Sequence, residues 1–339
     1  KIFGKEDADI FAQYFDITEE GNWEGNSIPR IIMKKSSLSN YLKIPEDKMN
    51  ESLSNSRIKV KEYRNSRIPP GTDDKVIVSW NGLMISSLAK VSSVLGKKEY
   101  FDTAAKAVDF IIQKMSKKDG TLNRIYRKNV AHIDAFAEDY SYFGNSLIDM
   151  YEASFDSKYL ELAKEYADIL VDQFYTDGLF KQSLSKNIVI KSGNSMDNAT
   201  PSYNFMCSLL LVRLHYYYDN KEYKAVVESS MEKAGQYINQ YPYAHSTALF
   251  VYNYLSNGPK EIVLAADTNT DPLMDIVKQT YIPCKIIASS STEMSLPILK
   301  DKKTVDGKYA IYICKNYTCK EPITKGNTLK TVTYTHMTP

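Results

Sequence analysis

The residues best suited to chemistry in this sequence are two groups of carboxylates. Asp74 lies in the stretch Asp73-Asp74-Lys75, and Glu138 and Asp139 stand side by side farther along the chain. Two carboxylates that face each other across a pocket can act as general acid and base, as glycoside hydrolysis and sugar epimerisation require. We predict that Asp74 and Asp139 are this catalytic pair. We further predict that Glu138 and Lys75 tune their protonation.

Residues that could bind a sugar accompany these carboxylates. Trp80, Tyr140 and Trp23 could offer the apolar face of a ring to a sugar. Trp23 and Glu24 lie between the glycines of Gly21-Asn22-Trp23-Glu24-Gly25, a segment rich in turn-forming residues. The predicted substrate-binding set is Trp80, Asn81, Tyr140, Asn204, Lys75, Trp23 and Glu24.

A structural explanation of the same residues stays open. Asp73 or Asp74 could cap a helix, and the pair Glu138-Asp139 could lie in the first turn of one, where the helix dipole favours acids. Trp80 could belong to the core. Lys75 could pair with a carboxylate at the surface.

Paired amphipathic helices repeat along the middle of the chain and are expected to position these residues. Asp-Gly dipeptides at 119–120 and 177–178 predict tight turns or small hairpins after two of the pairs. Because one helical hairpin cannot bury its own apolar face, such repeats form a solenoid or a closed toroid, and we favour the toroid. The apolar spacing predicts helices over 79–95 and 98–116, 134–153 and 157–174, and 201–218 and 221–239.

Polar residues recur at matching places in this repeat. Asp74, Asp139 and Asn204 follow one another at intervals of 65 residues, each near the start of the first helix of a hairpin. In a toroid these helix starts converge on one mouth of the barrel, so we expect a common opening there. His132, just before Glu138, is expected at the same rim as a further candidate for proton transfer, whereas His245 is expected to start a helix.

The chain divides into three predicted regions. Residues 1–70 form an N-terminal segment, and residues 71–256 form part of an (α/α) toroid of helical hairpins. Residues 257–339 form a small α/β domain with a parallel sheet. No Gly-rich phosphate loop follows its first strand, so no cofactor is predicted. The expected outer elements are helices at 6–15, 46–65 and 272–280 and strands at 261–266, 284–288 and 309–314.

Composition excludes several classes of function. With 43 basic and 41 acidic residues and a net charge of +2, the chain has no basic stripe or charge block, which argues against nucleic acid as its main partner. It has no apolar run long enough to span a membrane. The scattered cysteines and histidines support neither a metal site nor a redox pair, although redox regulation through Cys314 and Cys319 is a weaker alternative. Free thiols and the lack of an export signal favour the cytoplasm.

Four motifs together resemble the YyaL-like family, whose animal member is spermatogenesis-associated protein 20. The resemblance covers nearly the whole chain and implies a six-hairpin (α/α) toroid related to glycosidases and to the N-acylglucosamine 2-epimerase type. In that family a thioredoxin-like domain precedes the toroid. The motifs are Asp74-Lys75-x-x-x-Ser79-Trp80-Asn81-Gly82-Leu83-Met84, Glu138-Asp139-Tyr140, Gly21-Asn22-Trp23-Glu24-Gly25 and Cys314-Lys315-Asn316-Tyr317-Thr318-Cys319.

The sequence departs from the family pattern in three ways. The thioredoxin-like domain is absent, only about three hairpins are evident, and Tyr203 precedes Asn204 where the family has a small residue. The chain thus resembles the C-terminal half of a family member, with an incomplete toroid. A half-toroid would expose apolar helix faces for a thioredoxin-like domain, a second chain or residues 1–70 to cover.

These observations lead to two hypotheses of different class. The first is a carbohydrate-active enzyme module, a glycoside hydrolase or an epimerase, that uses the paired carboxylates at the toroid mouth. The second is a non-catalytic scaffold that docks a thioredoxin-like domain or another protein.

Overall fold

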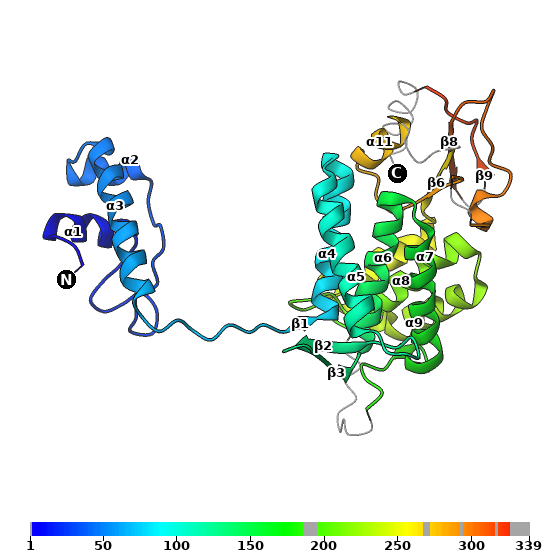
Figure 1. Cartoon of the computed structure of the whole chain (residues 1–339), viewed down its shortest axis with the longest axis horizontal. Helices are drawn as coiled ribbons and strands as arrows, with labels where there is room; N and C mark the ends of the chain where they lie inside the picture. Colours follow the sequence, from blue (N-terminus) through cyan, green and yellow to red (C-terminus); the bar gives the residue numbers. More distant parts are fainter. Residues whose placement is uncertain (1, 186–194, 267–271, 292–293, 316–317, 326–339) are drawn as a thin grey trace. The chain divides into compact units, whose positions relative to one another are not determined.

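The computed structural model describes residues 2–185, 195–266, 272–291, 294–315 and 318–325 of the chain. It divides into two compact units, residues 1–73 and 74–339 (Figure 1). The predicted boundary at residue 257, inside the second of these units, stays a prediction.

The first unit is built from α1 (Lys5–Tyr14), α2 (Lys35–Leu42) and α3 (Glu46–Asn65). The predicted helices at both ends of this unit are present, whereas α2 was not predicted. Each helix contributes apolar residues to one small core. These residues are Ile10, Phe11, Tyr14, Leu38, Met49 and Leu53.

Three helical hairpins follow one another in the second unit, as the apolar spacing predicted. The first helices of the hairpins, α4, α6 and α8, pack side by side with α6 in the middle, while α5, α7 and α9 return beside their partners. Both α6 and α8 are buried almost along their whole length. Apolar residues cover nearly all sides of α8, whereas α6 also buries polar side chains, among them Asp139, Asn145 and Asp149. The helices are α4 (Val78–Leu95), α5 (Lys98–Met115), α6 (Ala137–Ser154), α7 (Ser157–Ile169), α8 (Tyr203–Tyr218), α9 (Lys221–Gln240) and α10 (Ser246–Asn257).

Short strands connect the hairpins at the end where α4 and α6 begin. The sheet is antiparallel and has three strands, β1 (Val76–Ile77), β2 (Asn123–Arg127) and β3 (Val130–Asp134). A second hairpin of β4 (Tyr175–Thr176) and β5 (Leu179–Phe180) closes at the Asp177-Gly178 turn, as predicted.

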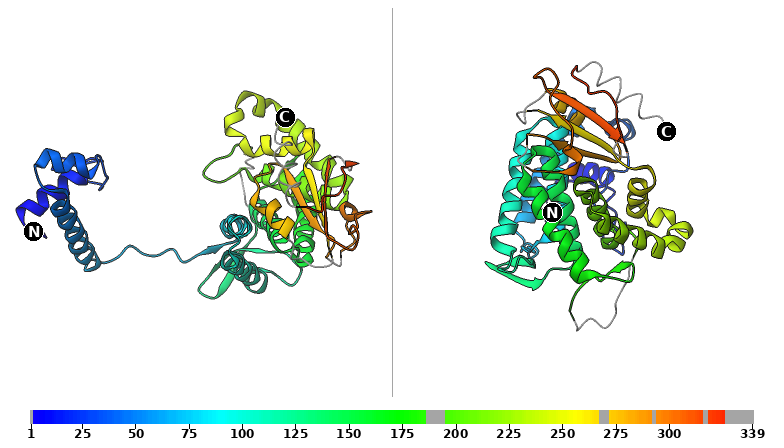
Figure 2. Two further views of the ribbon diagram at one scale, coloured as in Figure 1. Left: turned by 90° about the horizontal axis from the view of Figure 1, so that it is seen from above. Right: turned by 90° about the vertical axis from the view of Figure 1, so that its right-hand side faces the viewer.

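A mixed sheet follows the hairpins, at the end opposite to β1–β3 (Figures 1 and 2). Its strands are β6 (Lys260–Ala265), β7 (Lys285–Ser289), β8 (Ala310–Lys315) and β9 (Thr318–Cys319), in the order β7-β6-β8-β9. The chain passes from β6 to β7 through α11 (Pro272–Gln279), and these two strands are parallel.

The predicted all-parallel sheet is wrong, because β8 pairs with β6 in antiparallel orientation and β9 pairs with β8 in the same way. The described residues between β7 and β8 contain no α-helix, so this connection is not the helical crossover that keeps strands parallel. The predicted fold class, mainly α with an incomplete (α/α) toroid of hairpins followed by a small α/β part, is confirmed.

The cysteines correct a second expectation. Cys314 and Cys319 form a disulfide, whereas Cys207 and Cys284 are free and buried. The bonded pair are Cα partners across β8 and β9, only 4.0 Å apart, a proximity that their spacing in the sequence does not show. The expectation of free thiols therefore holds for two of the four cysteines.

Across the described residues, no helix has both the length and the apolar character needed to cross a bilayer.

Candidate functional site

Asp139 anchors the end of the hairpins at which the carboxylates were predicted to meet. Its carboxylate accepts hydrogen bonds from the backbone N–H groups of Ser79, at 3.0 Å, and Phe136, at 2.8 Å. It also pairs with Nη1 of Arg124 at 2.8 Å. Asp139 thus joins the start of α4, the start of α6 and strand β2, and it has no exposed surface.

Burial raises the pKa of the Asp139 carboxyl above its ordinary value, and Arg124 and the Phe136 N–H oppose that shift. A carboxylate with three donors and no exposure contacts its own chain rather than a ligand. Its predicted role in proton transfer stays untested, and this burial argues against it.

Glu138 is the neighbouring carboxylate that reaches solvent. Its Oε1 lies 2.5 Å from Nη2 of Arg124, and 18% of its side chain is exposed. The same guanidinium lies 4.4 Å from the centre of the Phe136 ring. One arginine, held from its buried side by Asp139, therefore fixes the orientation of Glu138.

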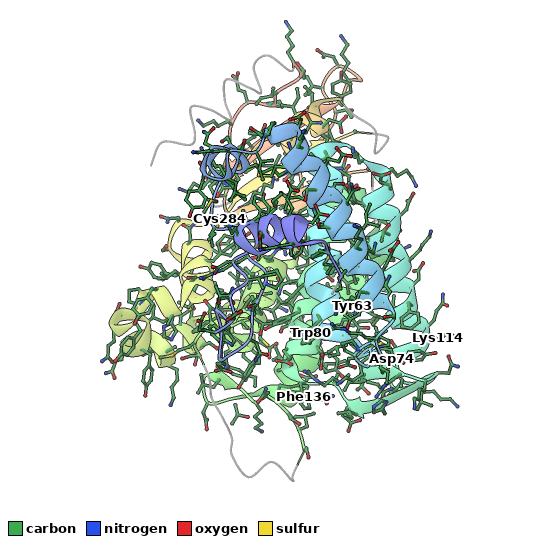
Figure 3. The ribbon with its side chains drawn as sticks, turned by 90° about the vertical axis from the view of Figure 1, so that its left-hand side faces the viewer. Tyr63, Asp74, Trp80, Lys114, Phe136 and Cys284 are labelled. Carbon is green, nitrogen blue, oxygen red and sulfur yellow. A yellow bond between two sulfur atoms is a disulfide. The ribbon has the colours of Figure 1, made fainter. Side chains whose placement is uncertain are left out.

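Asp74 and Trp80 lie in the open near the start of α4. The Asp74 side chain is 54% exposed and forms an ion pair with Arg127 of β2. The hydrogen bond from Arg127 holds the pKa of Asp74 below its usual value. The Trp80 side chain is 63% exposed, so it is not the core residue that a structural explanation proposed. Figure 3 shows Asp74, Trp80 and Phe136 toward the same end of the unit.

Three other predicted substrate contacts bond to the chain itself. The Tyr140 hydroxyl accepts a hydrogen bond from the Leu122 N–H at 2.9 Å, and Asn204 Oδ1 accepts one from the Phe180 N–H at 2.8 Å. Both side chains are buried. Asn81 donates to the carbonyl of Ile77 within its own segment. Lys75 is exposed. The substrate-binding roles of these residues stay predictions.

The interval of 65 residues has a structural explanation for two of its three members. Asp139 and Asn204 both accept a hydrogen bond from a backbone N–H of an adjoining element, at the start of α4 for one and at the end of β5 for the other. The repeat thus preserves a side chain that ties neighbouring segments together. Asp74 differs, because it precedes β1 and is exposed.

Trp23 and Glu24 belong to the first unit, so they are described apart from the residues above. Trp23 is 62% exposed, and Glu24 is exposed in the left-handed backbone region with φ of 46°. Asn22 holds this turn, since its amide donates to the carbonyl of Ile28 and accepts from the Ile28 N–H. Their predicted role stays a prediction.

Of the two candidate histidines, His245 starts a helix as expected, whereas His132 lies on a strand and its predicted place at a common rim stays a prediction. His132 is exposed on β3. His245 is buried at the N-cap of α10, and its Nδ1 lies 2.8 Å from the carbonyl oxygen of Tyr241.

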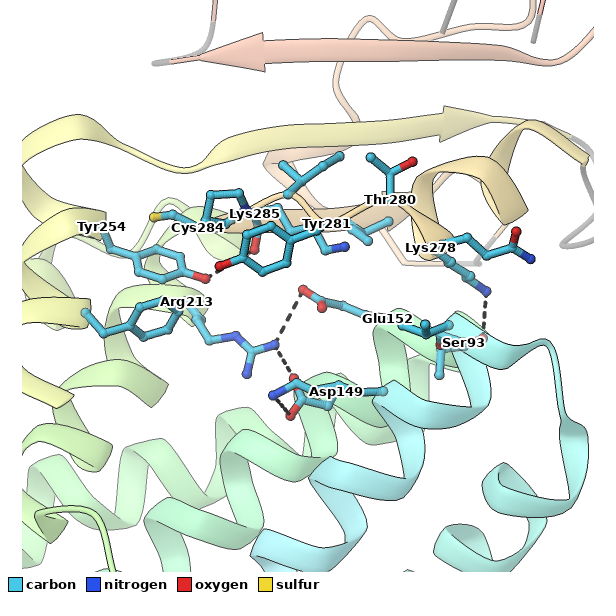
Figure 4. A pocket seen from close by; sticks show the side chains of 18 of the residues that line it. Ser93, Asp149, Glu152, Arg213, Tyr254, Lys278, Thr280, Tyr281, Cys284 and Lys285 are labelled. Carbon is cyan, nitrogen blue, oxygen red and sulfur yellow. Dashed lines mark hydrogen bonds and ion pairs between the residues drawn. The ribbon is translucent and has the colours of Figure 1, made fainter. Parts of the chain in front are cut away.

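A cavity of about 530 Å³, which the sequence did not reveal, lies between the hairpins and the mixed sheet (Figure 4). Helices α4, α6, α8, α10 and α11 and strand β7 all contribute to its walls. Apolar and aromatic side chains make up much of the lining, including Val94, Leu209, Phe250, Tyr254 and Ile287. The charged lining residues are Lys90, Asp149, Glu152, Arg213, Lys278 and Lys285.

Asp149 and Arg213 form the centre of the charged network in this cavity. Nη2 of Arg213 lies 2.8 Å from Asp149 Oδ1 and 3.5 Å from Glu152 Oε1. Lys90 Nζ lies 3.0 Å from Asp149 Oδ2, which also accepts from Ser86 Oγ. Burial alone would raise the pKa of Asp149, but Lys90, Arg213 and Ser86 together hold it below its ordinary value.

One sequence signal could have revealed this network. Arg213 is the single charged residue in the apolar run from Phe205 to Leu214, and Asp149 interrupts another apolar run in α6. A charged residue on an otherwise apolar helix needs a buried partner. In the part of the chain that is described, no group of three or more His, Cys, Asp and Glu residues could hold a metal ion.

No protein-family model matches the chain. It is 26% identical to an uncharacterised protein of Caenorhabditis elegans over 93% of this chain and 47% of that protein. It is 27% identical to human spermatogenesis-associated protein 20 over 78% of this chain and 37% of that protein. These similarities confirm the family resemblance inferred from the motifs. The chain spans about half the length or less of these relatives.

Solved structures with similar folds are more distant. A cellobiose 2-epimerase from Bacillus thermoamylovorans is 11% identical, with a TM-score of 0.40 over 47% of this chain and 44% of that one. A GH76 α-mannanase from Bacteroides thetaiotaomicron is 12% identical, with a TM-score of 0.40 over 62% of each chain. Similarity at this level says nothing about the activity of the chain.

Proposed function

We propose that this chain is part of a carbohydrate-active enzyme, a glycoside hydrolase or a sugar epimerase. The acid–base carboxylates would be Glu138 and Asp74, at the end of the hairpins where α4 and α6 begin. The observation that carries the proposal is the solvent-accessible Glu138–Arg124 pair, in the same end of the unit as the exposed indole of Trp80.

Each residue has a distinct part in this proposal. Asp74 would act as the base, because it is ionised, although the hydrogen bond from Arg127 that lowers its pKa also weakens it as a proton acceptor. Glu138 would transfer a proton at the sugar, and Trp80 would offer its ring face to the sugar ring. Asp139 is a positioning residue, since it holds Arg124 and the two helix starts without reaching a ligand.

The experiment compares E138Q with E232Q, in which an exposed carboxylate on α9 is changed in the same way. Saccharide binding and turnover of mono- and disaccharides are measured for both variants and for the wild type. We expect E138Q to lose at least ~100-fold in turnover, because it keeps its shape but cannot transfer a proton. E232Q should match the wild type.

W80A should bind the saccharide about tenfold more weakly, a loss of ~1.4 kcal/mol. Equal turnover of E138Q and E232Q, or wild-type protein that neither binds nor converts any saccharide, would reject the proposal.

A second candidate is a docking scaffold, and the outer face of α4 favours it. Exposed apolar side chains recur along this helix at Trp80, Met84, Val91, Val94 and Leu95. Their spacing places them along one side of the helix. Such a stripe is typical of a surface that a protein partner covers.

A further inference from the structure

The cavity between the hairpins and the mixed sheet carries an excess of positive charge. Four basic side chains line it against two carboxylates: Lys90, Arg213, Lys278 and Lys285 against Asp149 and Glu152. Both carboxylates are already engaged. Asp149 is bonded to Lys90, Arg213 and Ser86, and Glu152 accepts from the Tyr217 hydroxyl at 2.9 Å and pairs with Arg213.

The two lysines from the sheet side form no direct ion pair with these acids, and Glu152 acts on both only at longer range, where it opposes the lowering of their pKa by burial. Lys278 donates to the carbonyl of Ala153 at 2.8 Å, and its ammonium lies 4.8 Å from the centre of the Phe155 ring. Among the residues that the structure describes, neither Lys278 nor Lys285 has a carboxylate within ion-pair distance. Burial lowers the pKa of both lysines, and an anion beside them would oppose that shift.

Arg213 supplies a second, independent observation. Its side chain is 7% exposed, and its Nη atoms bond to Asn145 and Asp149. Its buried Nε–H finds no acceptor in the described part of the chain. A buried donor without a partner is costly, so the chain satisfies the Arg213 guanidinium only in part, and its positive charge stays at the cavity wall.

The rest of the cavity wall indicates what kind of molecule could bind beside these basic side chains. Leu209, Phe250, Tyr254 and Ile287 offer apolar and aromatic surface, and Tyr254 and Tyr281 lie beside Arg213 and Lys285 in Figure 4. A cavity of about 530 Å³ is within the range of small-molecule sites.

We propose that this cavity binds a small organic anion. Its carboxylate or phosphate group lies against Lys285, Lys278 and Arg213, and its apolar or ring-shaped body lies against Tyr254 and Leu209. This site differs from the one at Glu138. Val94 at the cavity and Trp80 at the other site are 14 residues apart on α4, so about 21 Å separates them along the helix axis.

Calorimetry measures the binding of four probes to the full chain. Phenyl phosphate and benzoate carry a ring and an anionic group, benzamide carries the ring without charge, and inorganic phosphate carries the charge without a ring. We expect phenyl phosphate, benzoate or both to bind at least ~10-fold more tightly than benzamide and inorganic phosphate. The better of the two identifies the acid group as phosphate or carboxylate.

K285Q should weaken binding of the better anion by about tenfold or more, whereas K114Q, an exposed lysine on α5 away from the cavity, should leave it unchanged. Benzamide that binds as tightly as the anions, or K285Q that binds like K114Q, would overturn the proposal.

A second measurement does not depend on any variant folding. Lysine acylation is followed by mass spectrometry on wild-type protein with and without the better anion. We expect Lys285 and Lys278 to be protected at least threefold while Lys114 reacts unchanged. Equal labelling of all three lysines in both samples would also overturn the proposal. Neither result affects the Glu138 proposal, because that proposal is tested separately by the turnover of saccharides by E138Q.

Discussion

A carboxylate in this chain takes its role from its surroundings rather than from its position in the repeat. Asp139 and Glu138 are neighbours in sequence and share Arg124, yet one has no exposure and the other reaches solvent. The same amino-acid types at a helix start serve equally as backbone anchors and as catalytic groups. The sequence therefore located this cluster without separating the two roles.

Asp149 allows a pH prediction at the residue scale. Its folded pKa lies below the ordinary value of 3.8, so its ionised form stabilises the fold above that value. This contribution is lost as the pH falls below 3.8 toward the folded pKa. D149N removes the nearer of the two carboxylates from buried Arg213 and leaves it only Glu152 at 3.5 Å, which should lower the free energy of unfolding at pH 7 by ~3–5 kcal/mol.

Urea unfolding at pH 7 and at pH 3 measures this effect. The difference between D149N and wild type should shrink at the lower pH. The control is D102N, which breaks the exposed Lys98–Asp102 pair and should change stability by less than ~0.5 kcal/mol. A D149N effect as small as that of D102N would contradict the prediction.

At the scale of elements, two glycines allow the inner helices to approach closely. A Cβ on Gly82 of α4 would lie 2.7 Å from the backbone nitrogen of Phe143 in α6. A Cβ on Gly144 would lie 2.6 Å from a methyl group of Leu210 in α8. The backbone contact is the harder one to relieve, because backbone atoms of a packed helix cannot rotate away.

We therefore expect G82A to destabilise the second unit by ~1–3 kcal/mol, since α4 and α6 must separate to make room. Gly235 in α9 is the matched control, because a Cβ there would meet nothing within 4 Å. G235A should be neutral or stabilising by up to ~1 kcal/mol, as alanine favours a helix over glycine. Thermal unfolding of both variants provides the comparison, and equal midpoints would show that α4 and α6 pack less closely than described.

The elements themselves were largely predictable. The helices at 98–115, 137–154 and 221–240 begin and end within a few residues of the predicted ranges, because a 3.6-residue apolar period is a local signal. Strands β2 and β3 carry polar and charged residues between the apolar ones, and α2 is short. For these reasons none of the three elements was evident in the sequence. The direction of β8 depends on its partner β6, which lies far from it in sequence.

At the scale of the whole molecule, the apolar stripe on α4 predicts association. M84E places a charge in the middle of this stripe, at a side chain that is 60% exposed. If the stripe docks a second copy of the chain, the wild type should form a dimer at micromolar concentrations and M84E should stay monomeric. V130E, on β3 at 58% exposure, is the matched control and should behave like the wild type.

Light scattering after gel filtration measures the mass of each species over a range of concentrations. Wild-type protein that stays monomeric at the highest concentration would remove self-association as the explanation of the stripe. Loss of the dimer in V130E as well would show that the contact lies elsewhere.

The sequence by itself determined the hairpins, their order, and the strands and helix that follow them. These features follow from the spacing of apolar residues, from turn residues and from helix-start preferences, all of which act within a few residues. The family resemblance rests on the same local motifs.

Only the tertiary structure decided which polar groups are buried and paired. Asp149 meets Arg213 across a separation of 64 residues, Cys314 bonds to Cys319 through strand pairing, and Asp139 loses its exposure because three elements pack around it. Burial and electrostatic pairing depend on neighbours that are distant in the chain. For this reason the cavity, with its excess of positive charge, could be found only once the helices and the sheet were placed against each other.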